Sequence, residues 1–264
     1  MHLGFNISYY NEGSCNMTRS TARAEEIIRS WKGDDYAFGM NALDTVGEFA
    51  ASFGESALLV VADLGQEWVA PLHRRIKDSL DENGVEYVSI IGAGPNAPRE
   101  DVYRIANEIS KTDFDCVIAV GGGSTIDAVK AASVLSTYIP EEVMEHLGAS
   151  EELASTIEPY FGVGNVTKIK EALDLDPTPV IAVQTIASSG AHLTKYSNIT
   201  DPLSGQKKLI VDMAVVPPKA VFDYSVTLGA PRGLTLDGAL DGIAHMWEVF
   251  MGAAGQEWYD QMRD

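Results

Sequence analysis

The chain has 264 residues, 45% of them hydrophobic, and its formal net charge is −19 because 38 acidic residues outnumber 19 basic ones. This length and hydrophobic content suffice for a sizeable core in one large or two smaller domains. The acidic residues are spread along the chain, which argues against nucleic acid as a partner. They favour a surface kept soluble by charge repulsion and suited to the high-salt cytoplasm of a halophile.

No apolar run approaches the ~18 residues of a membrane span. The first residues, MHLGFNISYYNEGS, lack the basic and apolar regions of a signal peptide. We therefore expect a cytoplasmic protein that does not interact with a membrane. Two cysteines, Cys15 and Cys116, are too few for a disulfide framework, so we expect both to be reduced and structural.

Predicted strands and helices alternate along the first half of the chain. A possible strand at residues 5–10 and a polar helix that begins near Thr21 come first, and a turn at residues 36–39 follows. Further on we expect helices at 41–53, 67–80 and 99–110, and strands at 57–62, 87–91 and 117–120. This alternation predicts a parallel sheet with helices on both faces, whose ligand crevice lies at the carboxyl ends of the strands.

The central stretch is DCVIAVGGGSTIDAVK, residues 115–130, where an apolar strand runs into Gly121, Gly122 and Gly123 and then into a helix. Glycines allow a positive φ and a close approach to a ligand. We expect Ser124 or Thr125 to cap the helix, with Asp127 in its first turn. Such a helix N-terminus suits a phosphate. A tight strand-to-helix turn without a ligand is the alternative.

Asp63 follows the predicted strand 57–62 directly. A carboxylate at that point can accept hydrogen bonds from the hydroxyls of an adenosine ribose and would repel a 2′-phosphate, which favours NAD over NADP. The alternative is an acidic N-cap of the next helix. In the ordinary Rossmann fingerprint the glycines precede the acidic residue by roughly 20 positions. Here Asp63 precedes Gly121, so the nucleotide fold is a different one.

Residues 138–176 contain short helical patterns at 141–146 and 166–173 but no motif. A strand at 179–184 then leads into TIASSGAH, residues 185–192, a small-residue loop whose backbone can approach a ligand. A hairpin is expected from 196–200 and 208–211, and a last strand at 220–223.

From Thr235 onward the sequence has helical spacing. Asp241 and His245 therefore share one face, with Asp237 and Glu248 one turn to either side. A carboxylate and an imidazole at this spacing suit Zn²⁺ or Fe²⁺, although a catalytic site needs at least three protein ligands. A simple hydrogen-bonded pair is the alternative.

Together these motifs resemble the iron-containing (group III) alcohol dehydrogenases. The resemblance covers nearly all of the chain except residues 15–33 and part of 138–176. It is carried by YAFG at 36–39, Asp63, GGGS with Asp127 and Lys130, the loop 185–194, Gly205 with Lys207, and DGIAH at 241–245. It implies an α/β fold: a dinucleotide-binding parallel-sheet domain of the dehydroquinate synthase-like type at 1–228, followed by the start of an all-α metal-binding domain at 229–264.

The resemblance also implies roles for individual residues. Gly122, Gly123 and Ser124 would hold the pyrophosphate of NAD, Asp63 the adenosine ribose, and Thr185 with loop neighbours such as Ser189 the nicotinamide side. Gly121 and Asp127 would complete the cofactor-binding set, with Lys207 near the cofactor ribose or phosphate. Asp241 and His245 match the first two ligands of the catalytic metal, Fe²⁺ or Zn²⁺. The implied reaction is hydride transfer between NAD and a primary or secondary alcohol or its aldehyde, with the metal polarising the substrate oxygen.

The sequence departs from the family pattern at three points. Ile186 replaces a threonine, His192 replaces a glutamate, and no histidine follows His245, whereas the family has two more metal-binding histidines further on. We therefore expect an unusual subfamily and a truncated, split or excised chain with impaired activity, partnered by a second copy or by a complementing C-terminal polypeptide. Alternatives are a non-catalytic nucleotide-binding fragment, half of a split enzyme, and a polyol-phosphate dehydrogenase or dehydroquinate synthase-like enzyme, which would call for extra basic residues.

Overall fold

The computed structural model describes residues 19–256. The chain divides into two compact units, Met1–Tyr36 and Ala37–Asp264. The described part of the first unit consists of helix α1 (Arg19–Lys32) and the 3₁₀ helix η1 (Gly33–Asp35). The helix predicted to begin near Thr21 is therefore confirmed. The strand predicted at residues 5–10 and Cys15 lie outside the described residues. The domain boundary predicted at 228/229 stays a prediction.

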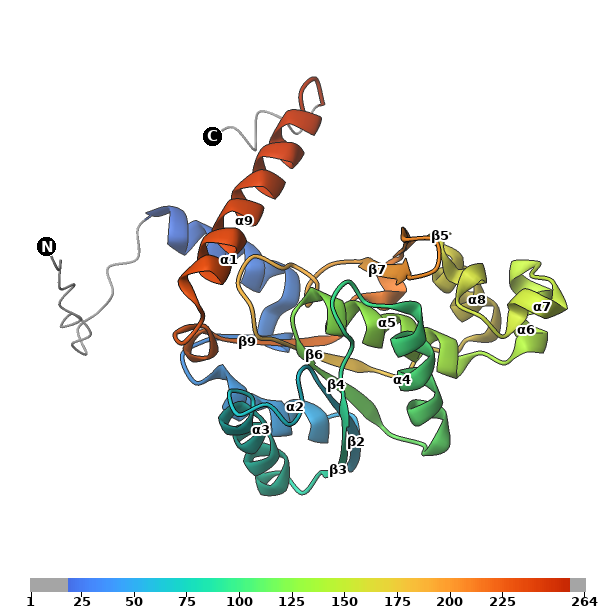
Figure 1. The fold of residues 1–264 in the computed structure, drawn as a ribbon, viewed down its shortest axis with the longest axis horizontal. Coiled ribbons are helices and arrows are strands. Elements are labelled where there is room, and N and C mark those ends of the chain that lie inside the picture. Colours follow the sequence, from blue (N-terminus) through green and yellow to red (C-terminus); the bar gives the residue numbers. More distant parts are fainter. Residues whose placement is uncertain (1–18, 257–264) are drawn as a thin grey trace, which may run out of the picture. The chain divides into compact units, whose positions relative to one another are not determined.

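Strands and helices alternate through the rest of the described chain (Figure 1). The larger sheet consists of β1 (Tyr36–Gly39), β2 (Ser56–Val61), β3 (Glu86–Ile91), β4 (Cys116–Gly121), β6 (Val180–Gln184) and β9 (Lys219–Asp223). The helices are α2 (Val46–Ala51), α3 (Ala70–Glu82), α4 (Arg99–Lys111), α5 (Gly123–Thr137), α6 (Pro140–Leu147), α7 (Glu151–Ala154), α8 (Asn165–Leu173) and α9 (Arg232–Gly252). Short 3₁₀ helices are η2 (Ala42–Thr45), η3 (Glu158–Tyr160), η4 (Met213–Val215) and η5 (Tyr224–Thr227).

The order of strands in the larger sheet is β1-β9-β6-β4-β2-β3. The neighbouring strands from β9 across to β3 pair in parallel, as the sequence predicts. After β2 the chain moves outward to β3, whereas β4 leads in the opposite direction to β6 and β9. The strand order therefore reverses between β2 and β4, and in such sheets ligands bind at this reversal, beyond the carboxyl ends of the strands.

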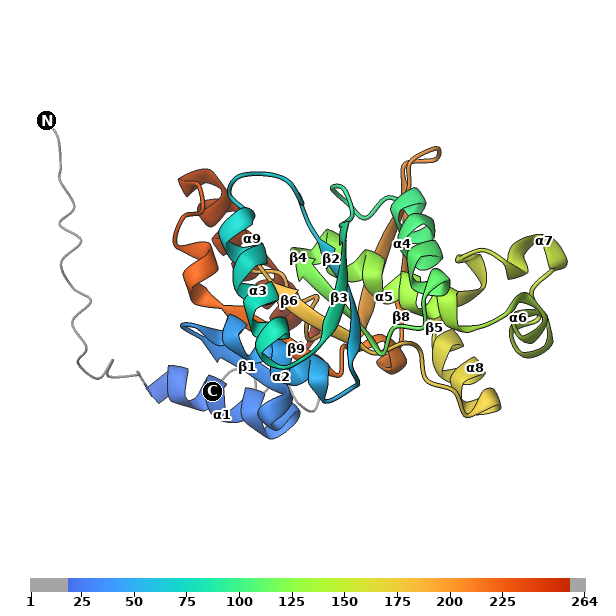
Figure 2. The same cartoon turned by 90° about the horizontal axis from the view of Figure 1, so that it is seen from below.

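Two helical layers cover the sheet, with α2 and α3 on one face and α4 and α5 on the other (Figure 2). In β2, Leu58 and Val60 pack toward the α4 and α5 layer, whereas Leu59 and Val61 pack toward the α2 and α3 layer. All residues of β4 are buried. This two-sided burial explains why the strands are continuous apolar runs instead of alternating ones.

A smaller, three-stranded sheet has the order β5-β8-β7, with β5 (Gly162–Val163) parallel to β8 (Gln206–Val211). The pair β7 (Tyr196–Asp201) and β8 is antiparallel, with Asp201 opposite Gln206. This pairing confirms the hairpin predicted from the sequence.

Three predicted boundaries were wrong. Residues 36–39 form β1 at the edge of the sheet instead of a turn, because pairing in the sheet outweighs local turn preference. The helix expected at 41–53 is a 3₁₀ turn followed by the short α2. The helix expected from Glu67 begins at Ala70 with Val69 as its N-cap, and turns precede it. Asp63 is consequently not the N-cap of α3.

Among residues 19–256, no helix is both long and apolar enough to cross a membrane. Cys116 is a free cysteine buried in β4. Burial raises the pKa of its thiol to about 12, so it stays protonated and acts as a small apolar residue, as expected.

The contact between α2 and α3 depends on the missing side chain of Gly47. A Cβ at this position would lie 1.9 Å from the main-chain oxygen of Ser79. We expect Gly47→Ala to lower the free energy of unfolding by about 2–4 kcal/mol, because two backbones would have to separate. Gly252→Ala in α9, where nothing lies within 4 Å, is the matched control and should be neutral or slightly stabilising. Equal effects in urea unfolding would contradict the packing argument.

Candidate active site

The glycine turn lies between β4 and α5, at the reversal of strand order. Gly122 is the N-cap of α5, with an extended backbone (φ −84°, ψ −171°), and the helix begins at Gly123. The prediction that Ser124 or Thr125 caps the helix is therefore wrong. The Ser124 hydroxyl oxygen instead accepts a hydrogen bond from the main-chain N–H of Asn96 at 3.0 Å. The first N–H groups of α5 have no partner within the helix, which leaves them directed at a ligand position.

The three glycines are required by close packing and not by positive φ, which none of them has. A Cβ at Gly121 would lie 2.9 Å from Cβ of Ala62. One at Gly122 would lie 3.0 Å from Cγ2 of Ile186, and one at Gly123 2.9 Å from Oγ of Ser189. The segment after β2 and the loop after β6 therefore approach the turn closely because it carries no side chains.

Asp63 lies beside this turn. The main-chain N–H of Ala62 donates to the oxygen of Val120 at 2.8 Å, which extends the pairing of β2 with β4 by one residue. Asp63 itself has a positive φ of 52°, and its main-chain oxygen accepts a hydrogen bond from Gln66. Asp63 follows the end of β2 by two residues and is exposed.

A pocket of about 620 Å³ begins at Gly122. Its lining includes Asp63, Trp68 and Thr185. The rest of the wall is mostly apolar and is formed by Ala62, Ile186, Val226, Gly229, Ala230, Pro231 and Leu234. We call this the Asp63 pocket.

A second pocket of about 620 Å³ begins at the next residue, Gly123. Its lining includes Asp127, the loop residues Ser188–Thr194 in part, and Tyr196 and Asn198 of β7. Helix α9 forms the remaining wall with Asp241, Gly242, His245, Met246 and Val249. We call this the Asp127 pocket. Consecutive glycines of one turn thus line two different pockets.

Asp127 is buried in the second turn of α5, not in the first turn as predicted. Its Oδ2 accepts a hydrogen bond from the main-chain N–H of Asn198 at 3.0 Å. Its Oδ1 accepts none among the described residues and lies 3.9 Å from Nζ of Lys130. Burial raises the pKa of this carboxyl to about 6, although Lys130 acts in the opposite direction. Such a buried acceptor in the lining of a pocket is suited to a donor on a ligand.

Lys130 is also buried, and it fastens the loop that follows β6. Its ammonium group donates to the main-chain oxygens of Thr194 and Tyr196, at 2.8 and 3.0 Å. The end of this loop is therefore fixed to α5, the helix that carries the glycine turn. Lys130 was predicted only as part of the motif, and its hydrogen bonds to the loop could not be read from the sequence.

The loop residues predicted to act together lie on different sides of the turn. The main-chain N–H of Thr185 donates to the oxygen of Gly121 at 3.0 Å, and Thr185 lines the Asp63 pocket. Ser189 lines the Asp127 pocket, where its hydroxyl oxygen accepts a hydrogen bond from Ala191 at 3.3 Å. Both residues were predicted to lie on the nicotinamide side of the cofactor, but they line two different pockets.

Lys207 of β8 reaches the glycine turn through Asn96. Its ammonium group donates to Oδ1 of Asn96 at 2.9 Å, and Asn96 in turn contacts Ser124. The turn between β3 and α4 thus brings a cation from the smaller sheet near the start of α5. The sequence contained no signal for Asn96, because its role depends on two partners far along the chain.

Helix α9, red in Figure 1, carries the predicted metal ligands. Nε2 of His245 lies 3.5 Å from Oδ1 of Asp241, and its Nδ1 lies 3.8 Å from Glu248, so the predicted common face is confirmed. Both side chains are more than half exposed. Within residues 19–256, no group of three or more His, Cys, Asp or Glu side chains is placed to hold a metal ion. Among the described residues, Asp241 and His245 are therefore not joined by the third ligand that a catalytic metal site needs.

His192 does not complete this set. It is buried, packs against the ring of Phe222 at 5.9 Å and is absent from the lining of the Asp127 pocket. Burial lowers the pKa of its imidazole to about 4, so it is neutral at physiological pH.

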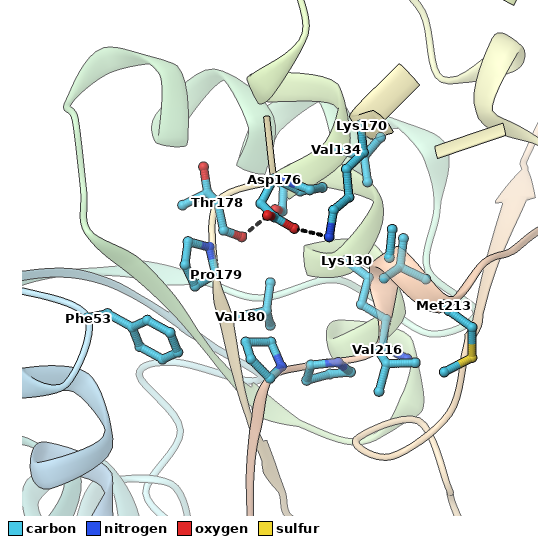
Figure 3. Close-up of a pocket in the computed structure, with 16 residues that line it drawn as sticks. Phe53, Lys130, Val134, Lys170, Asp176, Thr178, Pro179, Val180, Met213 and Val216 are labelled. Carbon is cyan, nitrogen blue, oxygen red and sulfur yellow. Dashed lines mark hydrogen bonds and ion pairs between the residues drawn. The ribbon is translucent and has the colours of Figure 1, made fainter. Parts of the chain in front are cut away.

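A further pocket, of about 390 Å³, lies at the amino end of β6, away from the glycine turn (Figure 3). Val180, Pro179 and Met213 form part of its wall, and Lys170 and Asp176 make an ion pair at its edge. None of the residues predicted to bind a cofactor or a metal lines it.

Residues 34–224 match the sequence profile of the family described as "Iron-containing alcohol dehydrogenase". The chain belongs to this family. Among curated relatives, the probable alcohol dehydrogenase EutG of Salmonella typhimurium is 30% identical over 216 residues, which are 80% of this chain and 48% of that protein. The NAD-dependent methanol dehydrogenase of Bacillus methanolicus is 24% identical over 81% of this chain and 50% of its own length.

Solved structures of iron-containing alcohol dehydrogenases and similar enzymes share the fold. The archaeal halo-thermophilic alcohol dehydrogenase ADH/D1 from a Red Sea brine pool superposes with a TM-score of 0.68 at 25% identity, over 82% of this chain and 50% of that one. The chain thus spans about half the length of these relatives. The profile match ends at residue 224, so Asp241 and His245 of α9 lie beyond it.

The buried carboxyl of Asp127 should make stability depend on pH. Its folded-state pKa lies above the ordinary value of 3.8, so ionisation in the folded chain is unfavourable, and this penalty grows as pH rises from about 4 to above 6. Between pH 4 and pH 7, we expect the free energy of unfolding of Asp127→Asn to rise by about 1–3 kcal/mol relative to that of the wild type. Chemical denaturation at both pH values measures this. A difference that does not change with pH would contradict the elevated pKa.

Proposed function

We propose that the chain binds NAD across the glycine turn, as the cofactor half of a metal-dependent, NAD-linked alcohol dehydrogenase or aldehyde reductase. The observation that carries this proposal is the pair of pockets that begin at Gly122 and Gly123. A dinucleotide has two halves joined by a pyrophosphate, so one half fits each pocket while the pyrophosphate occupies the turn. The names of relatives such as the NAD-dependent methanol dehydrogenase support the same cofactor.

The turn and its neighbours would hold the phosphates and the adenosine ribose. The main-chain N–H groups at Gly122, Gly123 and Ser124 face the pyrophosphate, where the positive end of α5 favours negative charge. Gly121 permits the close approach of β2. Asp63 accepts hydrogen bonds from the ribose hydroxyls, and Lys207 of β8 adds a positive charge.

The Asp127 pocket would take the nicotinamide half. When bound, NAD supplies the carbon that accepts or returns the hydride. The Oδ1 atom of Asp127 offers a buried acceptor to a donor group of the ligand, and Ser189 lines the same pocket. Thr185 remains on the opposite side of the turn, where it contributes to the Asp63 pocket.

Asp241 and His245 would be two ligands of an Fe²⁺ or Zn²⁺ ion at the far wall of this pocket. The described residues do not complete the site, because a catalytic metal needs at least three protein ligands. The remaining ligands would come from a further helical segment, in the same chain or in a partner polypeptide.

The lining favours an uncharged alcohol or aldehyde over a phosphorylated or acidic substrate. No Lys or Arg is among the described residues that line the Asp127 pocket, whereas Asp127 and Asp241 are. A phosphate group would meet two carboxylates and no cation there. This weakens the polyol-phosphate dehydrogenase and dehydroquinate synthase-like alternatives.

A side chain at Gly122 should prevent nucleotide binding. Gly122→Val places a branched side chain where a Cβ already meets Ile186 at 3.0 Å and where the pyrophosphate is expected. We expect the affinity for NADH to fall by more than about 100-fold in a fluorescence titration, which corresponds to roughly 3 kcal/mol. Gly94→Ala, which makes only ordinary contacts, is the control. Retained affinity in Gly122→Val would mean that the turn is only structural.

Asp63 should determine the preference for NAD. We expect tighter binding of NADH than of NADPH, because the carboxylate repels a 2′-phosphate. Asp63→Gly should narrow the ratio of the two dissociation constants by about tenfold or more. Glycine also tolerates the positive φ of this position. Equal affinity of the unmutated chain for both cofactors in calorimetry would refute the assignment.

The polypeptide of residues 1–264 should not oxidise alcohols by itself. Asp241 and His245 alone should bind Fe²⁺ or Zn²⁺ weakly, and the apolar side chains of Leu240, Ile243 and Trp247 on α9 are more than half exposed. A helical segment with two further histidines, added in cis or in trans, should restore metal binding and turnover together. Robust turnover with added metal but no such segment would show that the ligand set is complete without it. Absent turnover even with the segment would favour the non-catalytic alternative.

A further inference from the structure

Trp68 is an exposed aromatic residue at the rim of the Asp63 pocket. It lies in the turns between β2 and α3, and its side chain is 56% exposed. The next residue, Val69, is 1% exposed and anchors the start of α3 in the core. The side chain of Trp68 therefore lies both in the lining of the pocket and at the solvent, where a flat apolar group of a ligand can pack against its ring.

The lining of the Asp63 pocket is of two kinds. Gly122 and Thr185 lie next to the N-terminus of α5, which suits a phosphate. Other lining residues, such as Val226, Pro231 and Leu234, are apolar. No Lys or Arg is among the described lining residues, and Asp63 is the one charged side chain. The apolar part of the lining therefore suits an uncharged, flat group and not a phosphate.

We propose that Trp68 stacks on the adenine base of the bound nucleotide and makes the Asp63 pocket selective for purines. This inference rests on the proposed function, because Asp63 on the ribose places the adenine base in the same pocket. Base stacking on an aromatic ring buries apolar surface on both partners, and a purine offers a larger face than a pyrimidine. Pro231 and Leu234 line the same pocket and offer further apolar surface to the base.

The test is a set of titrations on the chain of residues 1–264 with AMP, CMP and NADH, followed by tryptophan fluorescence and calorimetry. Trp68→Ala should weaken AMP and NADH binding by roughly 5- to 100-fold and reduce the preference for AMP over CMP. Trp68→Phe should retain most of the affinity. Trp31→Ala removes a tryptophan of similar exposure (49%) in the first unit and should leave all three affinities unchanged.

Fluorescence separates stacking from a purely structural role. Four tryptophans are present in the chain, so quenching by AMP that disappears in Trp68→Phe, while binding persists in calorimetry, identifies the ring that meets the base. Unchanged AMP affinity in Trp68→Ala, or quenching that persists in Trp68→Phe, overturns the inference but leaves the proposed function standing. A wild-type chain that binds neither AMP nor NADH overturns the proposed function itself.

Discussion

The close packing of three glycines at the end of β4 is the constraint on which the arrangement of the site depends. Residues 121–123 carry no side chains, so other segments can approach them closely. A Cβ at these positions would lie within 3.0 Å of side-chain atoms of Ala62, Ile186 and Ser189. The segment after β2, the loop after β6 and the start of α5 therefore meet at one point. Asp63 comes from the first of these segments, and the two pockets open on either side of the turn.

A buried polar network holds the smaller sheet to this point. Asp127 contacts the main chain of Asn198, Ser197 donates to the main-chain oxygen of Asp127 at 2.7 Å, and Lys130 donates to two carbonyls near β7. Buried charges are unfavourable unless hydrogen bonds and opposite charges compensate them. Here Lys130 is compensated by two carbonyl oxygens and the nearby carboxylate of Asp127, so the network fixes β7 and β8, and with them Lys207, relative to α5.

The sequence predicted the features that depend on local pattern. Continuous β-branched runs such as β4 and β6 can be buried only on both faces, which indicates a parallel sheet with helices on both sides. The shared face of Asp241 and His245 follows from helical geometry alone. The juxtaposition of Asp63 with the glycine turn followed from the rule for parallel sheets.

Features that depend on distant partners could not be predicted in this way. None of the three glycines has a positive φ, so turn geometry does not require glycine at these positions. Close packing against other segments requires it instead. Ser124 does not cap α5 because the helix already begins at Gly123, and its hydroxyl oxygen instead accepts a hydrogen bond from Asn96 in the turn before α4. Thr185 and Ser189 line different pockets although only three residues separate them in the sequence. In each case the decisive contact joins segments whose proximity appears only in the folded chain.

The central claim is that one dinucleotide bridges the two pockets through the glycine turn, and a crystal structure of residues 1–264 with NADH tests it most directly. The account predicts electron density for the pyrophosphate against the main-chain N–H groups of Gly122 and Gly123, with adenosine in the Asp63 pocket and nicotinamide in the Asp127 pocket. Density for the cofactor in the pocket beside Lys170 and Asp176, or a reversed orientation with adenine beside Asp127, would contradict it.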